Sequence, residues 1–158
     1  MLRRPLAVVT LALLGALWPL PLAAQRPLRV AGAQGMTFGT LLPGVSTTVV
    51  PTDVARAARF DLTGAKGMRV EVVLMLPAAL TGAGATMPLS FTATSAAYSQ
   101  DGTGAATTLF DPRLPYTATL PNNGRASILL GATVAPGAAQ RPGAYSNVVT
   151  ITVAGLSL

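Results

Sequence analysis

Histidine and cysteine are absent from this 158-residue sequence, and lysine occurs only once. Without histidine and cysteine the chain lacks the commonest general base, the commonest activated nucleophile and most zinc ligands. The single lysine, Lys66, lies in "TGAKGM", which predicts a hairpin turn, whereas a catalytic lysine needs a desolvated site. We therefore predict that the protein is not an enzyme.

Carboxylates are also few. Each of the five stands beside an arginine or in a turn-like context, which favours solvated charges over the carboxylate pair of a glycosidase: Asp53, Asp61, Glu71, Asp101 and Asp111. The segment "SQDGTG" at 99–104 holds one of them, whereas a calcium site needs several oxygen ligands. It predicts an Asp-Gly turn instead. We expect no catalytic, cofactor-binding or metal-binding residues.

Charged residues make up only 10% of the sequence and aromatic residues 5%. The basic residues are scattered, whereas a nucleic-acid binder usually clusters them with aromatic side chains. We therefore expect a mildly basic surface and no nucleic-acid partner. The only tryptophan, Trp18, lies in the N-terminal leader, so none is left as a platform for a sugar ring.

The first 24 residues have the pattern of a cleavable signal peptide. Arg3 and Arg4 precede an apolar run, and small residues follow it, so we expect cleavage after Ala24. Pro19 and Pro21 interrupt the run before the roughly 20 apolar residues of a spanning helix, so no membrane span is expected after signal removal. Removing both arginines leaves nine basic and five acidic residues, a net charge of +4. The expected location is the periplasm, the cell surface or the extracellular space.

The mature chain has the pattern of an all-β domain. Short alternations of apolar and polar residues recur between Gly, Pro and Asn breaks, and no long helical stretch appears. "MTFGTLLPG" predicts a strand that ends in a Pro-Gly turn, and "MRVEVVLMLP" is the clearest strand. "LPYTATLPNNGRASILLGATV" predicts a hairpin, because Asn-Gly favours tight turns. "YSQDGTGAATTLFDPR" predicts a surface loop.

These patterns predict seven to eight strands in an immunoglobulin-like antiparallel β-sandwich, with a jelly roll or small barrel as the alternative. The expected organisation is a signal peptide at 1–24, a short N-terminal extension at 25–35 and the sandwich at 36–158. Tyr145, in "PGAYSN", is expected at a corner, with its hydroxyl hydrogen-bonded to backbone where a strand begins. The alternative role for Tyr145 is a ligand-binding aromatic.

Three blocks of the sequence, in this order, carry a family resemblance: "MTFGTLLPG", "ARFDLTGAKGMRVEVVLMLPAALTGAGATMPLSFTA" and "GRASILLGATVAPGAAQRPGAYSNVVTITV". Over Met36–Val153 the chain resembles a family of secreted Gram-negative bacterial domains of unknown function. That family is similar to spore coat protein U domains and, more distantly, to subunits of chaperone-usher fimbriae. The resemblance implies a β-sandwich with a structural role, in which a missing strand can be supplied by a neighbour's N-terminal extension.

Two segments are candidates for such strand pairing. The final strand carries no charge and no proline, so Val148, Val149, Thr150, Ile151, Thr152 and Val153 form a candidate edge for an incoming chain. Before the first block, only Leu28 and Val30 offer apolar residues for a donor segment, and no disulfide can form. Pairing with two internal strands is the alternative for the final strand.

Two functions are therefore expected. The first is a non-catalytic exported structural component of a surface or an appendage, which assembles with itself or with other envelope subunits by β-strand pairing. The second is a monomeric module that binds an envelope glycan or polymer through the loop at 99–113, with Tyr98 and Tyr116 stacking on the ligand. Neither function uses a cofactor.

Overall fold

The computed structural model describes residues 26–100, 105 and 108–156, and these residues form strands and turns without a helix. The predicted leader therefore lies outside the described residues. The strands are β1 (Arg29–Gln34), β2 (Thr47–Val49), β3 (Ala58–Thr63), β4 (Arg69–Met75), β5 (Ala79–Gly82), β6 (Ala85–Ser90), β7 (Ala96–Ser99), β8 (Thr108–Phe110), β9 (Tyr116–Thr119), β10 (Arg125–Leu130), β11 (Ala132–Val134) and β12 (Thr150–Leu156).

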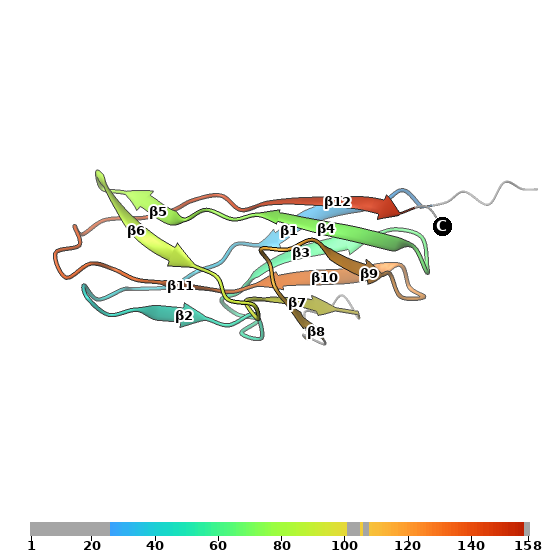
Figure 1. The fold of residues 1–158 in the computed structure, drawn as a ribbon, viewed down its shortest axis with the longest axis horizontal. Coiled ribbons are helices and arrows are strands. Elements are labelled where there is room, and N and C mark those ends of the chain that lie inside the picture. The colour runs from blue at the N-terminus through green and yellow to red at the C-terminus, as the bar shows by residue number, and fades with distance from the viewer. Residues whose placement is uncertain (1–25, 101–104, 106–107, 157–158) are drawn as a thin grey trace, which may run out of the picture.

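The twelve strands form three antiparallel sheets, which confirms the predicted all-β sandwich. The five-stranded sheet has the order β1-β3-β10-β7-β8, the four-stranded sheet β2-β11-β6-β5 and the three-stranded sheet β12-β4-β9. Figure 1 shows an elongated molecule in which β12 and β4 run along one layer and β10 and β11 along the other. The strands outnumber the predicted seven to eight because β1 and β8 form in the segments predicted as an N-terminal extension and a surface loop, and because one predicted run is divided into β10 and β11 where it passes between sheets.

Alternating side chains of the five-stranded and three-stranded sheets build one core. The strand predicted in "MRVEVVLMLP" is confirmed as β4, in which Val70, Val72 and Leu74 are buried while Arg69 points outward and is exposed. Residues paired across adjacent strands point to the same side of the sheet, so each of the two sheets has one apolar face. These two faces pack against each other. The wider core also includes Leu62, Tyr98, Phe110, Leu120, Ile128 and Leu130.

One long segment crosses from the five-stranded sheet into the four-stranded sheet at Gly131. β10 ends before this glycine and β11 begins after it, and Leu130 and Ala132 are buried on its two sides. The Gly131 amide donates to the Ser95 carbonyl at 2.8 Å. A Cβ atom at position 131 would overlap the carbonyl oxygen of Val49, so only glycine allows this close approach of two backbones.

The predicted hairpin around Asn123-Gly124 is wrong, although the turn itself is present. The Gly124 amide donates to the Pro121 carbonyl at 2.8 Å, and Gly124 has a φ of 67°. However, β9 pairs with β4 whereas β10 pairs with β3 and β7, so this turn joins two different sheets. The turn that contains Lys66 likewise connects β3 to β4 across the sandwich rather than within a hairpin. Turn chemistry identifies a reversal but not the strands that pair beyond it.

The predicted surface loop at 98–113 is also partly wrong. Its ends form a hairpin, with Ala96 opposite Phe110 and Tyr98 opposite Thr108. The candidate calcium ligand Asp101 lies outside the described residues. No described segment is a helix of the length and hydrophobicity that crossing a membrane requires.

Candidate functional site

The edge strands β1 and β12 lie beside one another on one side of the sandwich. Each has a single hydrogen-bonded neighbour among the described strands, β3 for β1 and β4 for β12. The two edges are in contact but form no ladder with each other. Leu28 closes the end of this seam, because its δ-carbons lie where Cβ atoms at Gly64 and Gly155 would meet them.

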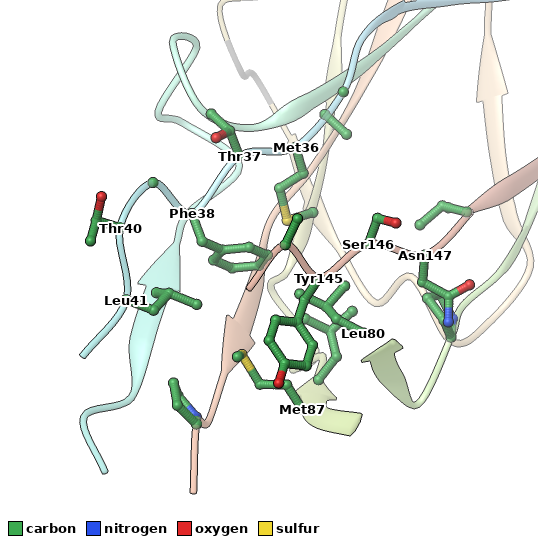
Figure 2. A pocket seen from close by; sticks show the side chains of 18 of the residues that line it. Met36, Thr37, Phe38, Thr40, Leu41, Leu80, Met87, Tyr145, Ser146 and Asn147 are labelled. Atoms are coloured by element: carbon green, nitrogen blue, oxygen red, sulfur yellow. The ribbon is translucent and has the colours of Figure 1, made fainter. Parts of the chain in front are cut away.

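Beyond this contact the two chains diverge and enclose an apolar groove. One wall is the continuation of β1, residues 35–43, and the other is the segment that leads into β12, residues 141–149. The cavity between them has a volume of about 1160 Å³. In Figure 2 the rings of Phe38 and Tyr145 extend into it from opposite walls, with Leu80 and Met87 beneath Tyr145. Phe60, Leu89 and Phe91 add further apolar lining.

The first wall is an extended segment without a strand partner. The sequence pattern predicts a strand in "MTFGTLLPG", but residues 36–41 belong to no ladder, which corrects that prediction. The amide of Thr37 donates to the Arg56 carbonyl at 3.0 Å, and the next four residues form no backbone hydrogen bond within the described chain. The Pro-Gly turn after them is present, with Gly44 at a φ of 74°. A strand-forming sequence therefore lies at this wall with its polar backbone unpaired.

The second wall forms backbone hydrogen bonds with the rest of the fold along one side only. Ser146 and Thr81 exchange both backbone hydrogen bonds, at 2.9 and 3.0 Å. Because successive residues of an extended chain direct their N–H and C=O groups to opposite sides, the backbone groups of Tyr145 and Asn147 face away from β5. Neither residue forms a backbone–backbone hydrogen bond within the described chain. This wall therefore also has an unpaired backbone edge.

Tyr145 forms the corner that the sequence predicts. Its hydroxyl donates a 2.8 Å hydrogen bond to the carbonyl of Arg141, and the side-chain amide of Gln140 donates to the same hydroxyl at 2.8 Å. Gln140 also donates to the Thr86 carbonyl at 3.3 Å, which ties the corner to β6. The ring is thus held in place as part of the groove lining.

Two further features fix the second wall against β5. The side-chain amide of Asn147 donates to the Ala79 carbonyl at 2.7 Å, and its oxygen accepts from the Val148 amide at 2.7 Å. A Cβ atom at Gly82 would overlap the carbonyl oxygen of Ala144, so glycine allows the wall to lie directly on β5. The open edge is therefore part of a well-anchored segment.

The groove is almost free of charge. Among its lining residues only Arg141 is charged, and it lies at the end of the groove near the β5–β6 turn, with its guanidinium close to Gly84. The described chain contains no group of three or more acidic residues that could hold a metal ion. The lining therefore suits an apolar occupant whose only charge is a negative group at the end near Arg141.

The structure divides the predicted strand-pairing residues between two environments. Thr150–Val153 lie in β12 and pair along one side with β4, and Ile151 and Val153 pack on the core. Val149 lines the groove, and Val148 is 75% exposed. The other side of β12 has no ladder partner among the described strands, and this unpaired edge continues before Thr150 into the groove wall.

The predicted donor residues are engaged inside the domain. Val30 pairs with Leu62 in the β1–β3 ladder, and Leu28 packs on the core. Using either residue as a donor requires β1 to leave β3. The boundary predicted at residue 35 consequently falls just after a strand of the domain itself rather than after a free extension.

The residues expected to bind a glycan lie away from the groove. Tyr98 is 3% exposed, and its hydroxyl donates to the Thr119 carbonyl at 2.8 Å. Burial, with a smaller effect from Tyr116, raises the pKa of Tyr98. Tyr116 is half-buried and stacks on Phe110 at a ring-centroid distance of 4.0 Å. Both rings are thus used in packing.

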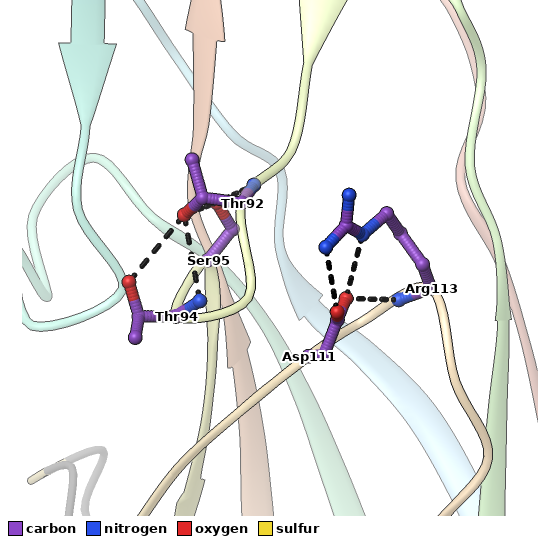
Figure 3. Close-up of polar contacts among 5 residues, drawn as sticks. All are labelled: Thr92, Thr94, Ser95, Asp111 and Arg113. Carbon is purple, nitrogen blue, oxygen red and sulfur yellow. Dashed lines mark hydrogen bonds and ion pairs between the residues drawn. The ribbon is translucent and has the colours of Figure 1, made fainter.

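The polar groups near these rings also serve the fold (Figure 3). Asp111 accepts two hydrogen bonds from the Arg113 guanidinium and one from its amide, and these contacts lower the pKa of Asp111 to about 2. In the turn before β7, Ser95 accepts from the Thr92 amide at 2.8 Å. Neither cluster lines the groove, which remains the best candidate site.

The model of one protein family, described as domain of unknown function DUF4402, matches residues 28–154. The chain belongs to this family. The DUF4402 match begins at Leu28, which closes the seam, and ends within β12, so it includes both walls of the groove. No curated protein matches the sequence.

The sequence identifies the corner tyrosine and the apolar final segment, but not the groove between them. Phe38, Leu80 and Met87 come from three separate segments that only the folded chain brings together. A sequence signal does exist in the two wall segments, since both have strand-forming patterns. That signal cannot reveal that the partner strand is missing.

Proposed function

We propose that this protein is an exported, non-catalytic structural component of a surface or appendage, and that it assembles through β-strand pairing. The observation that carries the proposal is the groove whose two walls both have unpaired backbone edges. Proteins usually cover or blunt such edges, because an edge of this kind is a template for another chain. The resemblance to spore coat protein U domains and to fimbrial subunits supports the same role.

A photo-crosslinking experiment in cells tests this function. The full chain is expressed for export with a photo-reactive amino acid at Thr40, an exposed residue of the groove wall, or at Thr117, an exposed residue of β9 far from the groove. Assembly through the groove predicts covalent adducts of defined mass from position 40 and none from position 117. Mass spectrometry of the adduct identifies the chain bound.

Two results would count against the proposal. If both positions give only the uncrosslinked monomer, strand assembly has no support, and a monomeric glycan- or polymer-binding module becomes the better hypothesis. If only position 117 reacts, assembly uses a different face. A polysaccharide-binding assay on the same preparation separates these cases, because a binding module retains affinity for envelope polymers as a monomer.

A further inference from the structure

The two groove walls are strand-forming sequences that lack a partner within the described chain. Residues 36–41 and 144–149 both follow the β pattern, yet the first forms no ladder and the second a single bridge to Thr81. Elsewhere the same pattern produces paired strands, as in β4 and β10. Both walls of the cavity therefore have strand-forming sequences but lack the ladder that such sequences form elsewhere in the domain.

A single added strand would resolve this disagreement. Strands in a sheet lie about 4.8 Å apart, and each added strand supplies donors and acceptors on both of its sides. An extended segment between the walls could pair with the outward backbone groups of Tyr145 and Asn147 and with the wall from Phe38 to Leu41. Six wall residues at about 3.3 Å each leave room for a strand of roughly six residues.

We infer that the groove binds an extended strand from a different polypeptide, with alternate apolar side chains directed into the groove and a single charged group, a carboxylate, near Arg141. This inference rests on the proposed function and specifies its partner. Alternate residues of a strand face the same side, so about three side chains of the occupant would contact Phe60, Leu80 and Met87. The cavity of about 1160 Å³ is larger than the roughly 300–1,000 Å³ typical of small-molecule pockets.

The occupant is assigned to a different polypeptide because every strand of residues 26–100 and 108–156 is already paired within the domain. The strands with alternating bulky side chains, β4, β10 and β12, are held in the core of the fold. β1 is the most exposed strand, but its sequence RVAGAQ has one large apolar residue, Val30, and it pairs with β3 over five positions. A second copy could donate a strand only by opening its own sheet.

Synthetic peptides test the inference with the full chain, expressed for export and purified. The first probe is a ten-residue peptide that alternates Val or Ile with Thr and has an Asp at one end as its only charged side chain, prepared with the Asp at either terminus. The second has the same composition with its apolar residues grouped together. Binding is measured by fluorescence anisotropy, and amide hydrogen exchange is followed at 36–41 and 144–149.

We expect one alternating peptide to bind at least about tenfold tighter than the grouped peptide, because only alternation directs every apolar side chain into the groove. We also expect slower amide exchange at Tyr145 and Asn147 on binding. The terminus at which Asp gives the tighter binding is the end of the peptide near Arg141, and this shows the direction of the bound strand. Equal binding of all peptides, or unchanged exchange at both walls, would overturn the inference.

Two variants with a matched control locate the binding site. Phe38→Glu places a charge in the groove and should weaken peptide binding at least about tenfold, because the carboxylate would be buried without a partner. Leu42→Glu, at a position 64% exposed, should leave binding unchanged. Arg141→Glu should reverse the preference from the Asp-ended peptide to a Lys-ended one by about two- to fivefold, as expected for an exposed ion pair. If Phe38→Glu binds normally, the peptide occupies another surface and the inference is wrong.

A cysteine pair tests whether a second copy is the occupant. Since the chain has no native cysteine, Arg29→Cys with Thr63→Cys can join β1 to β3 at two opposed, exposed positions. Light scattering should show the same monomer mass with the pair oxidised or reduced. A dimer that oxidation abolishes would show exchange of β1 between copies and overturn the assignment to a different polypeptide. Peptide binding without cellular adducts at Thr40 would instead refute the proposed function and leave the site intact.

Discussion

The hydroxyl of Tyr145 donates a 2.8 Å hydrogen bond to the backbone carbonyl of Arg141, four residues earlier. The bond closes the loop that precedes the second groove wall and holds the aromatic ring over Leu80 and Met87 (Figure 2). Tyr145 thus anchors the second wall through its hydroxyl and lines the groove with its ring. Removing the hydroxyl alone should abolish the anchoring hydrogen bond and leave the ring in the groove.

Tyr145→Phe is expected to lower the free energy of unfolding by about 0.5–1.5 kcal/mol, the usual net value of one hydrogen bond. Urea unfolding measures this change. Tyr116→Phe is the matched control, because the Tyr116 hydroxyl has no hydrogen-bond partner in the described chain. Equal effects from both variants would contradict the role of the corner.

Gly131→Ala should lower the free energy of unfolding by about 1–3 kcal/mol or more, because its Cβ atom would overlap the Val49 carbonyl where the chain crosses between sheets. Thermal unfolding is the measurement. Gly32→Ala serves as the control, since a Cβ atom there meets no atom within 4 Å. We expect that variant to be neutral or slightly stabilised, and comparable losses in the two would show that the crossing does not require glycine.

The pKa of Tyr98 predicts a loss of stability in alkali. Burial first, and the nearby Tyr116 second, raise the pKa of Tyr98 above the ordinary tyrosine value of 10.0. The unfolded tyrosine therefore ionises at a lower pH than the folded one. The stabilisation is complete below about pH 10 and declines as the pH rises above it.

Urea unfolding between pH 8 and 11 tests this dependence. Burial also raises the pKa of Tyr116, so the double variant Tyr98→Phe, Tyr116→Phe should show a shallower alkaline decline than the wild type. An unchanged slope in the double variant would rule out these two tyrosines as its source.

The ion pair of Asp111 with Arg113 should be visible in an acid titration. Hydrogen bonds from Arg113 lower the pKa of Asp111 to about 2 from the ordinary aspartate value of 3.8. The associated stabilisation is present above about pH 4 and is lost as the pH falls toward 2. Arg113→Met should return the pKa of Asp111 toward 3.8 in an NMR titration, whereas Arg56→Met should raise the pKa of Asp53 alone.

The sequence predicts the local features of this fold better than its connections. Alternation in "MRVEVVLMLP" identifies both faces of β4, because burial of one face leaves a period of two in the residues. The Asn123-Gly124 turn is also recognised, but not its role in joining two sheets. Which strands pair beyond a turn depends on packing between distant segments, which no short stretch of sequence contains.

In the candidate site, too, the sequence predicts the local features but not the contacts between distant segments. The corner at Tyr145 follows from "PGAYSN", a local pattern with a known physical role. The groove depends on Phe38, Leu80 and Met87, which approach one another only after three segments have folded. The predicted strand at 36–44 is the most informative error, because its residues have strand character and lack only a neighbour.

The pairing of β12 with β4 has a consequence for the biogenesis of the protein. β4 is the central strand of its sheet, and one of its two neighbours is the last strand of the described chain. A nascent chain that ends before Thr150 leaves β4 open along seven residue positions. The sheet cannot close until β12 is synthesised, so β4 is exposed to premature aggregation until then.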